Sequence, residues 1–207
     1  MRGRVRTGAG DVRAVGQDEE VGERLSPGPA LERVELLAAP VVAALRAWAG
    51  SVPVGEIEVV EIDPEVADTA AFCERYGVAA EESANCVVVA ARRGGDTRLA
   101  ACVVLASTRA DVNGLVRRHL DARKASFAPM DVAVAETGME YGGITPVGLP
   151  PDWPVLVDAA VAATPRVIVG SGLRRSKLWL PGAALAELPN AQVIDGLGQP
   201  VDPVAAR

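Results

Sequence analysis

Aromatic side chains are scarce in this sequence: Phe, Trp and Tyr make up 3% of the 207 residues, although 49% are hydrophobic. A core without many large rings must be built from Val, Ala, Leu and Ile, which favours strands packed by small helices. Long apolar runs are also missing, since no segment approaches the roughly 20 apolar residues of a membrane span. The start, MRGRVRTGAG, leads into acidic residues rather than an apolar signal core. We therefore expect a cytoplasmic protein.

Histidine and cysteine are rarer still. The cysteines are Cys73, Cys86 and Cys102. They show neither CxxC nor Cys/His ligand spacing, so we expect reduced thiols, no disulfide framework, no metal and no cofactor. The single histidine, His119, follows Arg117 and Arg118, which indicates an exposed helical face. A Ser-His-Asp triad therefore has little support.

Positive charge is in deficit, because 27 acidic residues outnumber 21 basic ones and the net charge is -6. This balance argues against a protein that holds nucleic acid by bulk electrostatics. Neither DNA nor a membrane is an expected partner. Any contact with RNA would have to depend on local groups of cations.

The length is that of one ordinary domain, with extensions. Residues 1–29 are rich in Gly, Arg, Asp and Glu without periodicity, which predicts a flexible leader. Residues 30–195 would form the domain, and residues 196–207 a loose tail. The first helical pattern spans residues 31–48, where Pro40 predicts a kink or two shorter helices.

Later segments alternate between strand and helix patterns. Two apolar runs, NCVVVAA from Asn85 and LAACVVLA from Leu99, flank the turn RRGGDT and predict a central β-hairpin. Strands are expected at residues 56–62, 155–161, 166–170 and 191–195. Helices are expected from Asp68 or Thr69 to Gly77, after Ser107 or Thr108, and at residues 129–137 and 181–188. This mixture predicts a mixed α/β (α+β) fold with a strongly curved sheet and helices against it.

Two loops offer small residues where a ligand could approach the main chain. The first is GMEYGGITPVG, residues 138–148, in which Gly142 and Gly143 can take backbone angles closed to other residues. The second is GSGLRRSK, residues 170–177, whose amides could bind an anion or a polarised carbonyl. Each could also be no more than a tight connection or a solvated turn.

Together with Asn85 and the run SFAPM after Arg123-Lys124, these loops resemble the YbaK/prolyl-tRNA-synthetase-associated domain family. GGITPVG is similar to the family's GGIxPxG loop, and an SG-containing loop follows a later strand. The resemblance extends over about residues 30–195. It implies a curved, barrel-like mixed sheet with surrounding helices. It also implies hydrolysis of the ester between an amino acid and the terminal adenosine of a transfer RNA, in trans or as an inserted editing domain.

The resemblance further implies where substrate binds. The first loop would shape the aminoacyl pocket, and the second would line the opposite wall. The residues concerned are Gly142, Gly143, Ile144, Thr145 and Pro146 in the first loop and Ser171 and Gly172 in the second. Many family members carry a lysine at the start of the first hairpin strand, where this sequence has Asn85. Asparagine donates two hydrogen bonds but supplies no positive charge, which leaves a changed substrate or a weakened activity open.

An aminoacyl ester is already activated, so positioning and oxyanion stabilisation could suffice for its hydrolysis. We hypothesise that water attacks the ester while main-chain donors at Gly142 and Gly143 hold the developing charge and Asn85 positions substrate or water. A nucleophilic Cys86 is the rival interpretation. It lies in an apolar strand, where a thiol is usually inert.

Two groups of cations could track the acceptor end of the RNA. They are Arg117, Arg118, Arg123 and Lys124, predicted in one helix and the turn after it, and Arg174, Arg175 and Lys177 in the second loop. The alternative is that these side chains only solvate the surface. The expected activity is deacylation of mischarged tRNA, of the tRNA-Pro editing type, with a small amino acid as cargo. A non-catalytic module that binds aminoacyl-tRNA or a synthetase is the alternative.

Overall fold

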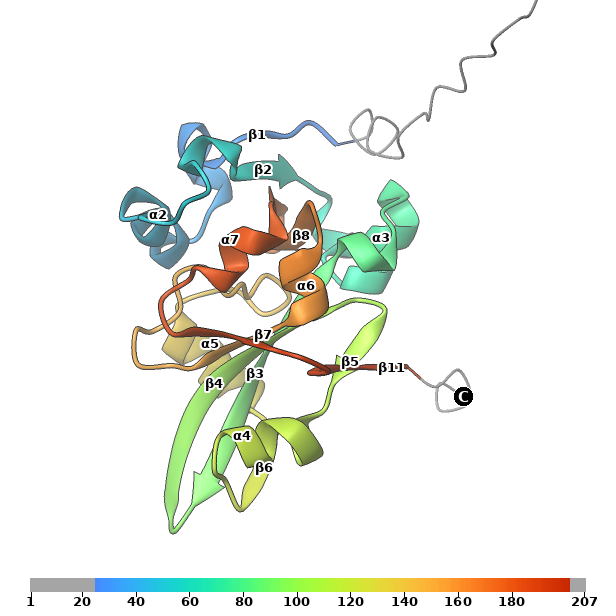
Figure 1. The fold of residues 1–207 in the computed structure, drawn as a ribbon. Coiled ribbons are helices and arrows are strands. Elements are labelled where there is room, and N and C mark those ends of the chain that lie inside the picture. Colours follow the sequence, from blue (N-terminus) through green and yellow to red (C-terminus); the bar gives the residue numbers. More distant parts are fainter. Residues whose placement is uncertain (1–24, 202–207) are drawn as a thin grey trace, which may run out of the picture.

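The computed structural model describes residues 25–201, whose strands form two larger sheets and one small sheet (Figure 1). The five-stranded sheet has the order β10-β7-β4-β3-β6. Its strands are β10 (Ala191–Ile194), β7 (Val155–Asp158), β4 (Asp96–Leu105), β3 (Ala84–Arg93) and β6 (Lys124–Phe127). The four-stranded sheet, antiparallel throughout, consists of β1 (Gly28–Pro29), β2 (Glu58–Glu61), β9 (Ser176–Leu180) and β8 (Val167–Gly170). The small sheet pairs β11 (Gly198–Pro200) with β5 (Thr108–Ala110).

The β3–β4 hairpin is central, as predicted. Both strands have a neighbour on their other side, since β6 pairs with β3 and β7 pairs with β4. The turn contains Gly94 and Gly95, and both have positive φ angles. The alternating apolar residues of these strands therefore reach two different layers of the protein.

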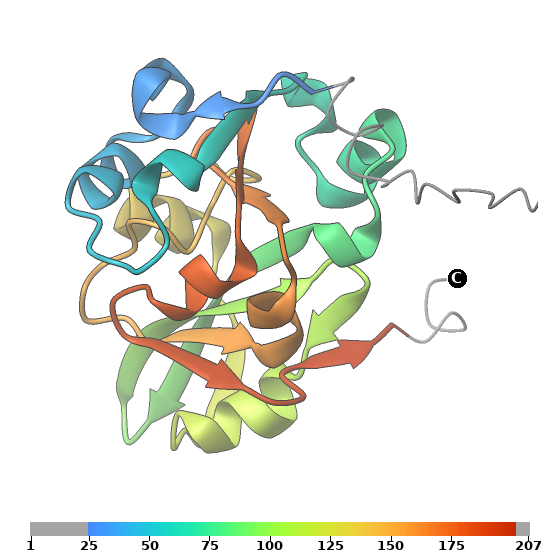
Figure 2. The same ribbon diagram turned by 45° about the horizontal axis from the view of Figure 1, so that its top comes forward.

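One layer fills the space between the two larger sheets. Val103 and Val157 on the five-stranded sheet share this core with Val59, Val169 and Leu178 on the four-stranded sheet. Their sequence neighbours Cys102 and Leu156 point to the opposite face, where residues 112–120 cover the sheet. This covering segment comprises η6 (Val112–Val116), which is π-helical, and α4 (Arg117–His119). Figure 2 shows β10 and β11 along the lower side of the molecule, near the end of the chain.

Two predicted helices are confirmed by their capping. Helix α3 (Thr69–Tyr76) begins where the Asp68 carboxylate accepts hydrogen bonds from the Ala70 and Ala71 amides, and ends at Gly77 with φ 68°. Helix α5 (Met130–Thr137) ends at Gly138 with φ 64°. Glycine takes this left-handed conformation without steric cost, which is why both ends were visible in the sequence. The structure also contains α6 (Ala159–Ala163) and α7 (Gly182–Ala186).

The first predicted helix is divided into shorter segments, as the presence of Pro40 led us to expect. Helix α2 (Ala39–Arg46) carries Pro40 in its first turn, where the missing N–H is tolerated. Two single 3₁₀ turns precede it, η1 (Ala30–Glu32) and η2 (Val34–Leu36). Other 3₁₀ turns are η3 (Val54–Glu56), η4 (Pro64–Val66) and η5 (Ala80–Glu82).

Other predictions were wrong in detail. Thr108 does not cap a helix, since it lies in β5 and Asp111 caps η6 instead. The strand expected at residues 155–161 ends at Asp158, whose carboxylate accepts from the Ala160 amide and starts α6. Strands β6 and β9 were not expected. Both strands are short, and they form by pairing with segments that are distant in the sequence.

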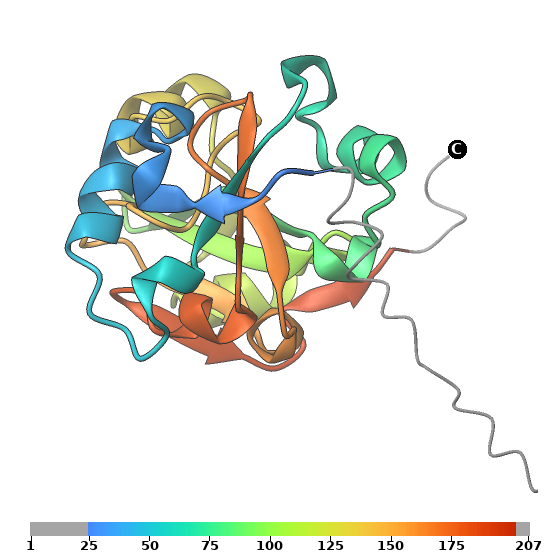
Figure 3. The same ribbon diagram turned by 90° about the horizontal axis from the view of Figure 1, so that it is seen from above.

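The described residues form a mixed α+β fold with separate sheets and no closed barrel, so a barrel-like sheet is not confirmed. Seen from above, the four-stranded sheet lies beside the helices of the N-terminal half (Figure 3). Most of the expected leader, residues 1–24, lies outside the described residues, whereas Leu25 is buried against Val60 and Phe72. The expected tail contributes β11. No helix within residues 25–201 is long and apolar enough to cross a bilayer.

Candidate active site

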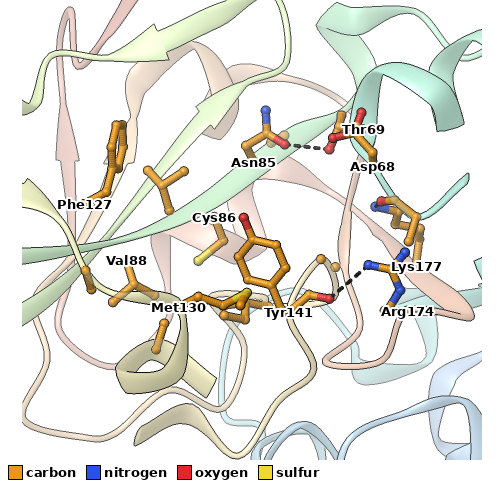
Figure 4. A pocket seen from close by; sticks show the side chains of 18 residues that line it. Asp68, Thr69, Asn85, Cys86, Val88, Phe127, Met130, Tyr141, Arg174 and Lys177 are labelled. Atoms are coloured by element: carbon orange, nitrogen blue, oxygen red, sulfur yellow. Dashed lines mark hydrogen bonds between the residues drawn. The ribbon is translucent and has the colours of Figure 1, made fainter. Parts of the chain in front are cut away.

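A pocket of about 590 Å³ opens beside the start of β3. It is bounded by the N-terminus of α3, the N-terminus of α5, the glycine loop 138–148 and strands β8 and β9. In Figure 4, Lys177 and Arg174 lie at one end of this pocket and Phe127 at the other, with Asn85 and Cys86 between them. The lining residues used below are Asp68, Thr69, Asn85, Cys86, Val88, Phe127, Met130, Ala133, Tyr141, Gly142, Ile144, Gly170, Arg174 and Lys177.

The two glycine-containing loops, expected on opposite walls of the pocket, lie in direct contact with each other. The Gly172 amide donates to the Gly143 carbonyl at 2.7 Å, and the Glu140 amide donates to the Gly172 carbonyl at 2.9 Å. A methyl group built on Gly170 would lie 2.3 Å from the Gly143 oxygen. Such a close approach of backbones requires glycine at residue 170.

This contact uses some of the main-chain donors that we expected to face substrate. The Gly143 amide donates to the Glu140 carbonyl at 2.9 Å, and the Gly172 amide donates to the Gly143 carbonyl. The Leu173 amide donates to Ser171 Oγ, and the Arg174 amide to Glu140 Oε2. Gly142, which does line the pocket, keeps an amide with no partner among residues 25–201.

Several predicted substrate contacts lie off the pocket wall. Ser171 is fully buried, and its hydroxyl lies 2.7 Å from the Ser176 hydroxyl. Gly172 packs against Ala38 and Met139, and Thr145 is fully buried. Pro146 lines a different hollow, together with Trp48. These residues therefore build the loops rather than the surface of the pocket, while Gly142 and Ile144 lie on that surface.

Asn85 occupies the polar part of the pocket and is held by α3. Thr69 Oγ1 donates to Asn85 Oδ1 at 2.6 Å, as Figure 4 shows. The Asn85 amino group has no partner among the described residues. Because the carbonyl side is fixed, the two amide N–H donors remain available to a ligand.

Lys177 is the candidate site residue whose surroundings differ most from those expected from the sequence. It was grouped with exposed RNA-binding cations, but it lies in β9 with only 5% of its surface exposed. Its Nζ donates to the Ala67 carbonyl at 2.9 Å and lies 5.3 Å from the centre of the Phe72 ring. Burial lowers the pKa of Lys177 to about 8. The one signal in the sequence was its position inside the run SKLWL.

Arg174 joins the loops around the pocket mouth. Its guanidinium donates to the Tyr141 carbonyl at 3.3 Å and to the Pro64 carbonyl at 3.0 Å. Arg175 donates to the Glu35 carbonyl. Both side chains are exposed, so they combine a structural role with a positive surface beside the pocket.

The other predicted cations lie elsewhere. Arg117 and Arg118 are in α4, and Lys124 begins β6 after Arg123. Figure 1 shows α4 at the end of the molecule opposite β8, and β6 extends from beside α4 to the pocket, where its last residue, Phe127, lies at the end away from Arg174 and Lys177. The two groups of cations therefore do not form one continuous patch around the pocket.

The thiols are poorly suited to nucleophilic attack. Burial raises the pKa of Cys86, and the neighbouring Cys102 raises it further. Burial raises the pKa of Cys102 to about 12. A protonated thiol is a weak nucleophile, so the environment of Cys86 disfavours the rival thiolate mechanism.

Three solved structures resemble this fold. One comes from work on epitope backbone grafting by computational design, with TM-score 0.64 and 23% identity over 78% of this chain and 97% of that chain. Another is a proposed trans-editing enzyme for prolyl-tRNA synthetase, with TM-score 0.63 and 21% identity over 79% and 99%. A hypothetical protein matches with TM-score 0.60 and 21% identity over 68% and 90%. At these identities the likeness establishes the fold alone.

Sequence comparison identifies the family. No curated protein sequence matches the chain. The family model described as an aminoacyl-tRNA editing domain matches residues 63–188, which is more than half of the chain and includes all the residues that line the pocket. The protein belongs to the aminoacyl-tRNA editing domain family.

Proposed function

We propose that this protein hydrolyses the ester bond of mischarged aminoacyl-tRNA in trans and acts in the cytoplasm. The expected cargo is a small amino acid such as alanine, cysteine, serine or threonine, in editing of the tRNA-Pro type. The observation that carries the proposal is one pocket with polar donors and cations at one end and an apolar surface at the other. It lies largely within the segment that matches the editing family.

The size and lining of the pocket support an aminoacyl ester as ligand. A volume of about 590 Å³ lies within the usual range for small-molecule sites. Val88, Ala133 and Ile144 provide a surface of modest-sized apolar side chains for the cargo. One methyl or hydroxyl changes affinity in such a pocket by about 1–3 kcal/mol, so discrimination among small cargoes would be limited.

In the proposed reaction, water attacks the carbonyl carbon and a tetrahedral intermediate forms. The bond to the ribose oxygen then breaks, a proton reaches that oxygen, and free amino acid and tRNA are released. The Gly142 amide would hold the developing oxyanion, which is supported by the position of Gly142 in the pocket lining and by the lack of a partner for its amide among the described residues. The Asn85 amino group would position the ester or the water. Gly143 would act by supporting the loop.

Docking of the RNA would begin at the pocket mouth, where Arg174 and Arg175 are exposed. Phosphates of the acceptor end are the natural partners of these guanidinium groups. The second group, Arg117, Arg118, Arg123 and Lys124, would be reached only by RNA that extends beyond the Phe127 end of the pocket. A synthetase could share the task of holding the RNA.

The proposal is tested by incubating the pure protein with a panel of tRNAs charged with correct and incorrect small amino acids. We expect release of amino acid from at least one mischarged tRNA, at a rate well above the buffer blank. Tight binding without release from any of them would favour the alternative, a non-catalytic module that binds aminoacyl-tRNA or a synthetase. This alternative is favoured by the uncharged Asn85, which stands where many members of the resembled family carry a lysine.

Replacing Thr69 with valine should lower kcat/KM for deacylation by about fivefold. The substitution preserves shape but removes the hydrogen bond that fixes the Asn85 amide, and one such bond is worth about 1 kcal/mol. Thr164→Val is the matched control, because the Thr164 hydroxyl donates to the Ala160 carbonyl away from the pocket. Equal kcat/KM values for the parent and Thr69→Val would show that Asn85 needs no such orientation.

A further inference from the structure

We propose that Lys177 is the catalytic cation of this pocket and that its ammonium group stabilises the negative charge that develops on the carbonyl oxygen of the ester. This inference rests on the proposed function and extends it to a residue outside the glycine loops. The charge that Asn85 lacks at the start of β3 would then come from a different strand, β9.

The first observation is an ammonium group with unused donors. Lys177 is 5% exposed, yet its Nζ has a single hydrogen-bond partner among residues 25–201, the Ala67 carbonyl. No carboxylate of these residues lies within 4.0 Å of it in an ion pair. A lysine can donate three hydrogen bonds, and buried charges are normally paired. Apart from the Phe72 ring, 5.3 Å from Nζ, two of its N–H donors therefore have no partner among these residues.

The second observation is position. Lys177 pairs across the sheet with Gly170, the residue at which the two loops come into contact. Both residues line the pocket, as does Gly142, whose amide is free. Lys177 and Gly142 thus border one pocket, and a buried ammonium group together with a free main-chain N–H are donors of the kind that stabilise the oxyanion of a tetrahedral intermediate.

The third observation concerns the charged and titratable groups that face Lys177. Burial and the nearby Arg174 favour its neutral form, whereas Asp68, and Cys73 when it is ionised, favour its charged form. The Asp68 carboxylate also accepts hydrogen bonds from the first amides of α3. Burial raises the pKa of the Cys73 thiol, so that thiol does not neutralise the lysine. The ammonium thus persists below pH 8 and disappears at moderately alkaline pH.

The decisive experiment uses the whole 207-residue chain and whichever charged tRNA the parent deacylates. We expect Lys177→Met to lower kcat by at least about 100-fold, as loss of an oxyanion donor does, while KM changes only a few-fold. Arg46→Met removes an exposed cation of α2 and should leave both constants unchanged. Full activity of Lys177→Met would overturn the inference but leave the proposed function intact. If the parent released no amino acid from any tRNA, the proposed function would fail first, and the inference with it.

A pH profile separates this role from a purely structural one. After subtraction of spontaneous hydrolysis, kcat of the parent should fall as the pH rises through about 8, because the ammonium loses its proton. The residual activity of Lys177→Met should lack this fall. A parent rate that rises through the same pH range would identify a neutral amine acting as base and would overturn the inference. The parent profile gives this answer even if Lys177→Met does not fold.

Discussion

Replacing Gly170 with alanine is expected to lower the free energy of unfolding by about 3 kcal/mol, at the upper end of the usual cost of overpacking. The new methyl carbon would lie 2.3 Å from the Gly143 carbonyl oxygen and 2.6 Å from that of Ile144. Both obstacles are backbone atoms in a loop tied by further hydrogen bonds, so neither can move without breaking the contact between the loops. Urea unfolding of the variant and the parent measures the difference.

Gly55→Ala is the matched control for Gly170→Ala. Nothing lies within 4 Å of a methyl group built on Gly55, so a change of less than about 0.5 kcal/mol is expected. Gly170→Ala should also impair ligand binding, because the residue lines the pocket and joins its two loops. A Gly170→Ala protein as stable as the Gly55→Ala protein would show that the loops can separate at little cost.

The second large effect is a pH-dependent stability difference between Lys177→Met and the parent. The folded state lowers the pKa of Lys177 from 10.5 to about 8, mainly through burial. Below pH 8 the lysine is charged in both folded and unfolded chains. Burial of this charge then destabilises the folded parent by its full free energy. Between pH 8 and 10.5 the folded chain loses the proton first, so the parent gains stability as the pH rises.

The stability of Lys177→Met minus that of the parent should therefore fall by about 3 kcal/mol between pH 7 and pH 10, at about 1.4 kcal/mol for each tenfold change in proton affinity. Urea unfolding at several pH values measures this difference, and groups that titrate alike in both proteins cancel. A difference that stays constant over the range would mean that the folded chain does not shift the proton affinity of the lysine.

Local signals in the sequence predicted a considerable part of the fold. Asp68 and Gly77 bound α3 because a carboxylate caps free amides and glycine tolerates a left-handed backbone, and both effects operate over a few residues. The β3–β4 hairpin was predicted for the same reason, since its turn and its apolar runs are contiguous. The family resemblance rested on loop residues that keep their order and spacing, and the family itself is confirmed.

The pocket was predicted less completely. Asn85, Gly142 and Ile144 do line it, but which amides remain free depends on how two loops meet. The partner of the Gly172 amide is the carbonyl of Gly143, and no side chain marks that pairing. Backbone hydrogen bonds are available to almost every residue, so a sequence carries little record of which distant partner each one finds.

By itself, the amino-acid sequence determined the capped helices, the central hairpin, the two small-residue loops and the family to which they belong. Only the tertiary structure decided that β9 joins β2 and β8, and thus that Lys177 is buried in the pocket instead of exposed on a loop. The physical reason is the distance along the chain between the residues that interact. Caps and turns depend on neighbours in the chain, whereas the burial of a charge depends on segments more than 100 residues away, such as Ala67, which accepts its hydrogen bond.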